Sequence, residues 1–253
     1  MDAHLLASAY CGGNAILDRL SPHEREDLAL HLSVYIEEEG SVLRARDRRI
    51  DAVHFPIDAV YSVVVELSLG ETYEVDFIGR AGVVGAEVAV GAEIASRTVL
   101  CQAGGRVAKL PREPFIDALA QNRPFFVAVR ESLRRQWFEG QQTVACNFVH
   151  TIEQRAARWI LITQDQIGRE HFPLRAELLS IMLGVTAAMV RGPLAVLVHL
   201  GCICYEDDYV TVLSREALRE YGCECYDLLK LERCISPDGG ALTIEHKVDR
   251  SAL

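Results

Sequence analysis

The sequence predicts an α+β protein built from three successive parts: a small antiparallel β-barrel, one long helix, and a helical unit that ends in a β-hairpin. Between Val34 and about Pro111, short β-branched and aromatic runs alternate with glycine-containing turns, as in small all-β domains. Residues 123–150 then repeat apolar side chains every three or four positions. After His150, two helical patterns joined by a glycine turn precede an alternating segment. The 253 residues, half of them hydrophobic, suffice for two domains.

The first domain is placed at residues 1–122. Residues 1–33 are expected to be helical, with a helix start at Ser21, which is followed by Pro22 and by Glu24 at the third position. The expected strands include residues 53–56 (VHFP), 59–67 (AVYSVVVEL) and 72–78 (TYEVDFI). We expect them to close into a barrel or to form a sandwich of jelly-roll type.

The long helix is placed at residues 123–150, after Asn122 and with Pro124 in its first turn. Its apolar residues recur at spacings of three and four and form a single seam, which is typical of a two-helix dimer interface. The alternative is that the seam packs only against the barrel of the same chain. The residues expected at the dimer interface are Phe126, Val129, Leu133, Trp137 and Val144.

The last domain is placed at residues 151–235, and residues 236–253 are expected to be a loose tail. A helix begins at Thr151. A short amphipathic helix from Leu174 stops at Gly184, and a second runs from Thr186 towards Leu200, which is the helix-turn-helix pattern. Residues 202–213 alternate around an acidic turn and predict a small hairpin, or wing.

This order of parts resembles the cyclic-AMP receptor protein/FNR (Crp/Fnr) family of bacterial transcription regulators. The resemblance rests on five segments of the chain: residues 53–56, 79–85 (GRAGVVG), 145–159 (ACNFVHTIEQRAARW), 182–185 (MLGV) and 222–226 (GCECY). It implies a cyclic-nucleotide-binding-like barrel, a dimerisation helix and a DNA-binding winged helix-turn-helix. It also implies a homodimer whose partner is DNA.

The residues of the expected recognition helix depart from the pattern that the resemblance implies. The positions where the family has Arg, Glu and Arg are Ala187, Ala188 and Gly192, and Pro193 is expected to kink or shorten the helix. The segment from Leu174 to Arg215 contains three Arg residues and four acidic residues, a net charge of −1. A domain that binds several DNA phosphates needs a local excess of positive charge, which this segment lacks. The candidate DNA-binding residues are Arg175, Thr186, Ala187, Ala188 and Arg191.

The net charge of −10 argues against a protein that coats nucleic acid non-specifically or binds anionic membranes. The sequence contains neither an apolar stretch long enough to span a bilayer nor a basic region ahead of its N-terminal apolar run. We therefore expect a cytoplasmic protein with no membrane partner. It contains no nucleophile triad, phosphate-binding loop or metallohydrolase motif, so an enzyme is not expected.

A small-molecule effector would occupy the barrel, according to the resemblance. Family members that bind cyclic nucleotides hold the phosphate with Arg followed by Ser or Thr, and the ribose with Glu directly after Gly. Here Arg97 and Thr98 match, but Ala86 separates Gly85 from Glu87. We expect Glu87, Arg97 and Thr98 as ligand residues only if the pocket survives; the alternative is a structural Arg97 paired with a carboxylate such as Glu87. The effector stays unknown.

The eight cysteines are expected to be reduced thiols, and no resident cofactor is expected. Cys11 stands alone near the N-terminus, where an FNR-type cluster would need several cysteines. Cys202 and Cys204, together with Cys223 and Cys225, could supply four thiolates to zinc, but their spacing is not the usual two-residue knuckle. Buried, inert thiols are the favoured interpretation.

Two hypotheses about function follow. The first is a homodimeric transcription regulator that binds DNA through its C-terminal winged helix. The alternative is a family member that no longer recognises DNA specifically and acts through protein contacts of Ala187, Ala188 and Met189 with the acidic wing. A sensor of a nucleotide messenger is a third possibility, which rests only on Arg97 and Thr98.

Overall fold

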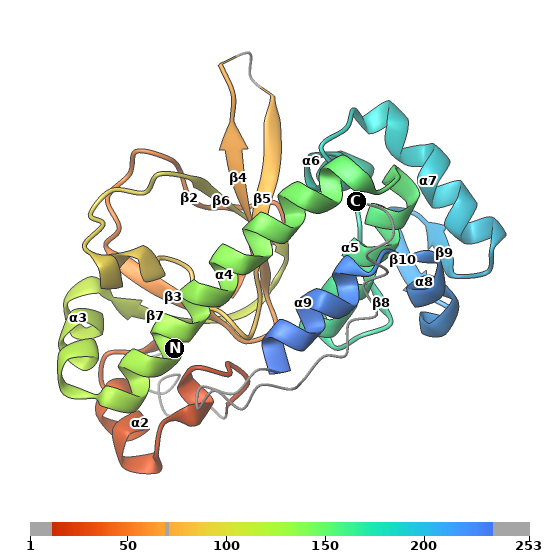
Figure 1. The fold of residues 1–253 in the computed structure, drawn as a ribbon. Coiled ribbons are helices and arrows are strands. Elements are labelled where there is room, and N and C mark those ends of the chain that lie inside the picture. The colour runs from red at the N-terminus through yellow and green to blue at the C-terminus, as the bar shows by residue number, and fades with distance from the viewer. Residues whose placement is uncertain (1–11, 69–70, 235–253) are drawn as a thin grey trace, which may run out of the picture.

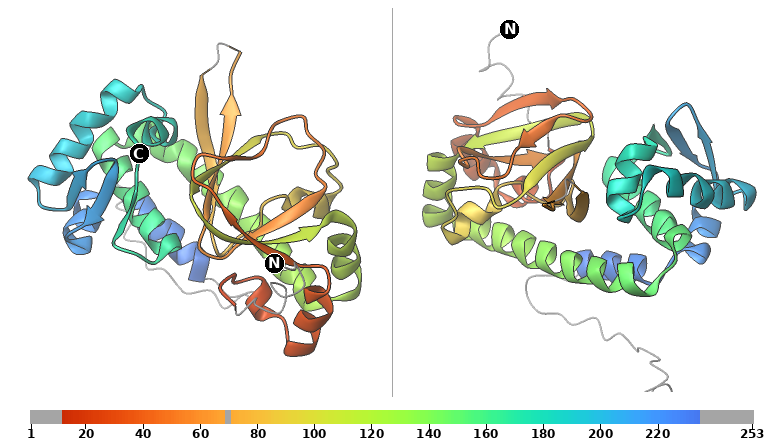
Figure 2. Two further views of the ribbon diagram at one scale, coloured as in Figure 1. Left: turned by 180° about the vertical axis from the view of Figure 1, so that it is seen from behind. Right: turned by 90° about the horizontal axis from the view of Figure 1, so that it is seen from above.

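A computed structural model describes residues 12–68 and 71–234 of the chain. A β-domain lies at one side, a helical C-terminal unit at the other, and one long helix runs along both (Figures 1 and 2). The three predicted parts and their order are therefore confirmed. Residues 1–11 and the predicted tail at 236–253 lie outside the described residues.

The N-terminal segment contains two short helical elements, η1 (Leu17–Arg19) and α2 (Pro22–Ala29). Ser21 begins α2 as predicted: its hydroxyl accepts from the Glu24 amide at 3.3 Å, and the Glu24 carboxylate accepts from the Ser21 amide at 2.8 Å. This reciprocal capping satisfies two amides that have no partner within the helix.

The β-domain is two antiparallel sheets and not a closed barrel, so the expectation of closure is corrected. One sheet has the order β1 (Ser33–Glu37), β7 (Gly105–Pro111), β3 (Ala52–Pro56). The other has the order β2 (Val42–Arg44), β6 (Thr98–Ala103), β4 (Val60–Glu66), β5 (Thr72–Ile78). Bulges in the β4 pairings interrupt the regular register and bend the second sheet.

Two helices leave the β-domain in succession. Helix α3 (Arg112–Gln121) is followed by α4 (Arg123–Val149), where the Asn122 side chain caps the first turn by accepting from the Phe125 amide at 2.8 Å. The 27 residues of α4 make it about 40 Å long at 1.5 Å per residue. Its first half packs on the β-domain core through Phe125, Ala128 and Val129.

The C-terminal unit is a bundle of short helices with a three-stranded sheet. Helix α5 (Ile152–Ile167) is its central element and is buried along much of its length. The remaining elements are β8 (His171–Pro173), α6 (Ala176–Leu183), α7 (Ala187–His199), β9 (Ile203–Glu206), β10 (Tyr209–Val212), α8 (Arg215–Tyr221) and α9 (Cys225–Cys234). Figure 1 shows α9 lying alongside α4.

The two units share one apolar core. Val60, Phe77 and Ala103 of the β-domain belong to the same buried cluster as Trp159 and Ile160 of α5. A side-chain hydrogen bond also crosses the boundary, from Gln102 Nε2 to Thr163 Oγ1 at 3.1 Å. The C-terminal unit is therefore docked on its own β-domain, not tethered loosely to it.

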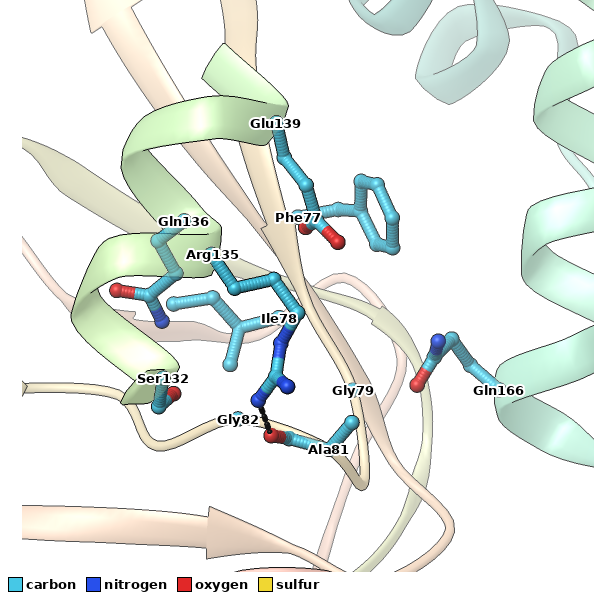
Figure 3. Close-up of a pocket in the computed structure, with 10 residues that line it drawn as sticks. All are labelled: Phe77, Ile78, Gly79, Ala81, Gly82, Ser132, Arg135, Gln136, Glu139 and Gln166. Atoms are coloured by element: carbon cyan, nitrogen blue, oxygen red, sulfur yellow. Dashed lines mark hydrogen bonds between the residues drawn. The ribbon is translucent and has the colours of Figure 1, made fainter. Parts of the chain in front are cut away.

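The glycine motif at 79–85 lies where the β-domain, α4 and α5 meet. Figure 3 shows Arg135 of α4 donating to the Ala81 carbonyl, while Gln166 of α5 faces Gly79. A Cβ at residue 79 would collide with the Gln166 side chain, so glycine permits this close approach. The space left there is about 10 Å³, room for no more than a water molecule.

Among the described helices, none is both long enough and apolar enough to cross a membrane by itself. Helices α6 and α7 satisfy those criteria only when taken together, and they meet at a bend of 96°.

Candidate nucleic-acid interface

Helices α6 and α7 form the predicted helix-turn-helix. Gly184 ends α6 with φ 61°, a left-handed conformation that favours glycine, and the Val185 amide bonds the Ser180 carbonyl at 3.0 Å. The 96° bend lies within the range usual for this motif. The buried residues Val190, Leu194 and Leu197 fix α7 on the core of the unit.

The structure does not confirm that Pro193 shortens the recognition helix, because α7 continues to His199. The proline ring is buried against the unit, whereas Met189, one turn earlier, is exposed on the helix surface. Pro193 has no amide hydrogen, so the carbonyl of Met189, four residues earlier, lacks its usual hydrogen bond within the helix. Because Met189 is exposed, water can donate to this carbonyl instead. The expected shortening of the helix is therefore wrong, and α7 runs through Pro193.

The outward face of α7 is almost uncharged. Ala187, Ala188, Met189 and Gly192 are exposed, and Arg191 is the one Lys or Arg side chain on this helix. Thr186 precedes the helix without a side-chain capping bond. Amides at such a helix start can donate to a phosphate oxygen, and short alanines permit close approach. The face is therefore better suited to backbone contacts than to base recognition.

The wing is present and acidic at its tip. Strands β9 and β10 pair through Tyr209 and Glu206, and the two turn residues Asp207 and Asp208 have φ 51° and 60°. Two successive left-handed residues make the tight hairpin turn in which aspartate is well tolerated. Part of the wing's negative charge therefore follows from the turn geometry.

A surface hollow lies between α6, α7 and the wing. Arg191 and His199 contribute basic groups to its lining, while Glu177 and Asp208 contribute carboxylates. The Tyr205 hydroxyl donates to the Leu174 carbonyl at 3.0 Å and contacts Asp208 at 3.1 Å. Burial, followed by the bond to Asp208, raises the pKa of Tyr205 to about 12, so it stays protonated.

Arg175 points towards the β-domain in this arrangement. Its Nε lies 3.0 Å from Glu39 Oε1, and the guanidinium passes close to Gly40. Helix α6 also packs against β5, and Tyr73 of that strand lies near Gly184. A residue predicted to contact DNA is thus paired within the chain, a contact that no local pattern of residues could reveal.

The three residues predicted to bind an effector, Glu87, Arg97 and Thr98, each have a different partner in the structure. Glu87 pairs with Arg44 at 3.7 Å, not with Arg97, so the proposed Arg97–Glu87 pair is wrong. Arg97 is exposed and bonds the neighbouring Ser96 carbonyl, whereas the buried Thr98 hydroxyl donates to Glu66 at 2.7 Å. The buried Arg44 fills the structural role that was assigned to Arg97.

The predicted dimer seam divides into two parts along α4. Val129 is fully buried in the β-domain core and is not accessible to a second copy, while Leu133 packs partly against the same core. Phe126 is partly covered, with Arg123 stacked over its ring. Trp137, Val144 and Phe148 are exposed, at 72%, 58% and 88%. The alternative that the seam packs against the β-domain of the same chain therefore describes only the first half of α4.

The two Cys-x-Cys pairs do not meet. Cys202 and Cys204 belong to the start of the wing, and their residues pair within the hairpin. Cys223 and Cys225 are buried between α8 and α9, where they lie with Cys146 and His150 of the α4 end. The four-thiolate combination weighed from the sequence is therefore wrong, and Cys146 and His150 were missed because their sequence distance is large.

Comparison with known proteins identifies the fold. No protein-family model and no curated protein sequence matches the chain. A CRP-family transcriptional regulator from Thermus thermophilus is 18% identical, with a TM-score of 0.63, covering 74% of this chain and 95% of its own.

Two further solved structures agree with it. FixK2 of Bradyrhizobium japonicum is 13% identical, with a TM-score of 0.65 and coverage of 76% and 98%. The c-di-GMP-responsive global regulator CLP of Xanthomonas campestris is 10% identical, with a TM-score of 0.63 and coverage of 77% and 100%. The chain therefore has the three-part fold of Crp/Fnr-type regulators over most of its length.

Proposed function

From its Crp/Fnr-type fold, we propose that the chain is a homodimeric transcription regulator that binds DNA through α7 and the wing. The observation that carries the proposal is the complete helix-turn-helix. Helix α7 is uninterrupted, held on a buried core, and exposed along the side that would enter a major groove. Arg191 and the Thr186 end of α7 are the groups on this face that suit phosphate or base edges.

The proposed DNA contacts are mainly with phosphates, and few side chains of α7 can recognise individual bases. Arg191 would supply the one strong charged contact, and the α7 amides would bind a phosphate. Ala187 and Ala188 offer only apolar contact to a thymine methyl group. We therefore expect modest sequence preference for each half-site, with two half-sites about one DNA turn apart.

The dimer is proposed to form along the exposed second half of α4. Trp137, Val144 and Phe148 follow one another at spacings of seven and four, so they lie along one stripe of the helix. Sedimentation of the purified chain should show a dimer that Trp137→Glu converts to a monomer. A dimer that survives this change would place the interface elsewhere.

The test of DNA binding uses fragments of the source genome. The full chain is mixed with them over a range of salt concentrations, and the retained DNA is sequenced. A recurring two-fold symmetric site, whose retention weakens steeply with salt, is expected. Arg191→Ala should weaken binding to that site by about 5- to 150-fold, which corresponds to the usual contribution of about 1–3 kcal/mol from one good contact.

Arg48→Ala is the matched control, because Arg48 is an exposed arginine on the β-domain, outside the helix-turn-helix. It should leave binding unchanged. If an intact dimer retains no DNA even at low salt, the DNA-binding proposal fails for the effector-free protein.

A second function is favoured by one specific observation, the apolar face of α7. Met189 and Val196 lie two turns apart on one edge of the exposed side of α7, and both are at least 36% exposed. Val198, 43% exposed, lies on the opposite edge, where it lines the same hollow as Asp208 of the acidic wing. Such a surface suits a partner protein with an apolar patch and basic rim. Stoichiometric recovery of one protein by the wild-type chain, lost with Met189→Glu, would favour this function over DNA binding.

A further inference from the structure

Four metal-binding side chains from distant parts of the sequence meet at the junction of α4 and the C-terminal unit. Cys146 lies near the end of α4 and His150 directly follows it, while Cys223 lies in the turn between α8 and α9 and Cys225 is the first residue of α9. One ligand atom from each residue lies within 4.8 Å of every other. The Sγ atoms of Cys146 and Cys223 are 3.6 Å apart, and Cys225 Sγ is 3.7 Å from His150 Nδ1.

These separations match the coordination of one small ion. Zinc binds thiolate at about 2.3 Å, so two sulfurs in a tetrahedral site lie about 3.8 Å apart. Zinc–imidazole bonds of about 2.0–2.1 Å place the nitrogen at a similar distance from each sulfur. A multi-iron cluster would distribute its ligands over different iron atoms and hold them farther apart. Three Cys and one His are an established ligand set for structural zinc.

Side chains around the four groups already hold them in suitable orientations. His150 Nε2 lies 3.0 Å from Glu224 Oε2, which leaves Nδ1 directed at the sulfurs. A carboxylate bound to the far nitrogen is the usual support of a metal-ligating histidine. Gln142 Nε2 also contacts Cys225 Sγ at 3.1 Å. The histidine tautomer that metal binding requires is therefore the one that the contact with Glu224 stabilises.

The site is shielded from solvent and lies near positive charge. Cys146, Cys223 and Cys225 are each at most 4% exposed, and the His150 side chain is 10% exposed. Arg155 and Arg158 of α5 are buried beside Cys146, and some of their nitrogens lack a hydrogen-bond partner in the described part of the chain. Zinc with three thiolates and one imidazole carries one net negative charge, which these guanidinium groups would balance.

We propose that Cys146, His150, Cys223 and Cys225 bind one Zn²⁺ ion that fixes the C-terminal unit to the end of the long helix. Two ligands come from the C-terminal end of α4 and two from the start of α9 and the turn before it, so the ion would join the segment entering α5 to the segment leaving α8. It would limit rotation of the helix-turn-helix about residue 150. The site is independent of the proposed DNA contacts, because none of its ligands lies on α7 or the wing.

The first experiment measures metal in the full chain, expressed with zinc and kept reduced. We expect one zinc per chain by elemental analysis. Cobalt added to the demetallated protein should give intense visible absorption bands typical of tetrahedral thiolate coordination. Cys223→Ser should lower the zinc content at least tenfold and weaken the cobalt bands.

Cys202→Ser is the matched control, since Cys202 is also a buried thiol but lies in the wing. It should keep its zinc. Circular dichroism identifies variants that fail to fold, and the cobalt spectrum of the wild-type chain tests the site without any variant.

Four results would overturn the proposal. The first is a reduced wild-type chain that binds neither zinc nor cobalt. The second is zinc retained equally by Cys223→Ser and Cys202→Ser. The third is iron with acid-labile sulfide in place of zinc. A Cys146–Cys223 disulfide in protein isolated under reducing conditions would also contradict it, because it would remove two of the ligands.

Discussion

The two faces of the C-terminal unit differ in how they use charge. The inward face, on the β-domain, holds Arg175 against Glu39 and the buried Arg158 near Glu74. The outward face, on α7, carries Arg191 and His199 among alanine, glycine and valine. Arg175 and Arg158 thus interact with carboxylates of the chain itself and not with DNA phosphates. Under the proposed function, DNA affinity should therefore depend on how firmly the C-terminal unit is docked on the β-domain.

The largest of the predicted effects should come from Glu74, a buried residue of β5 that lies near Arg158 on the inward face of the C-terminal unit. Burial raises the pKa of Glu74 from 4.5 to about 7, against the opposing influences of hydrogen bonds with Ser62 and Trp159 and the charge of Arg158. The folded chain therefore retains a proton that the unfolded chain has lost between pH 4.5 and 7. Stability should fall as pH rises through that window and level off above pH 7.

Glu74→Gln removes this ionisation. At pH 8 the variant should be more stable to urea unfolding than the wild type by about 3 kcal/mol, from 1.36 kcal/mol per pKa unit. At pH 4.5 or below, this stability difference between the variant and the wild type should disappear, because Glu74 is then protonated in the folded wild type. Glu71→Gln, an exposed neighbour at the start of the hairpin strand, should change neither value. A wild-type stability that does not vary between pH 5 and 8 would contradict a buried, ionisable Glu74.

The outward face is tested by adding a side chain that can recognise bases. Ala187 is exposed in the first turn of α7, where an arginine would extend towards the major groove. Ala187→Arg should tighten binding to the selected DNA site by about 1–3 kcal/mol if a guanine is within reach, measured by fluorescence anisotropy. Ala187→Leu controls for side-chain size. Equal effects of arginine and leucine would show that this face does not contact nucleic acid.

The sequence was sufficient to predict the helices and turns, but it did not predict which distant segments contact one another. The Ser21 cap, the start of the long helix at residue 123 and the Gly184 turn depend on neighbouring residues, so local patterns predicted them. The seam on α4 was predicted too simply, because Val129 and Trp137 have the same periodicity but different surroundings. Nothing near Cys146 indicates Cys223, since 77 positions separate them. Arg175 and Glu39 are likewise brought together only by the docking of two units.

The smallest effect is expected at the ion pair between Arg175 and Glu39, which links the inward face of the C-terminal unit to the β-domain. Glu39→Gln removes the partner of Arg175, which is 48% exposed at its side chain, so the loss of stability should stay below about 1 kcal/mol. Freed from Glu39, Arg175 can turn towards a phosphate, and DNA binding should tighten by less than about fivefold, with a steeper salt dependence. Glu38→Gln, next to it but outside this pair, is the control. If Glu39→Gln weakens DNA binding instead, the docked arrangement is the one that binds DNA, and the inward contacts support the DNA-binding face instead of competing with it.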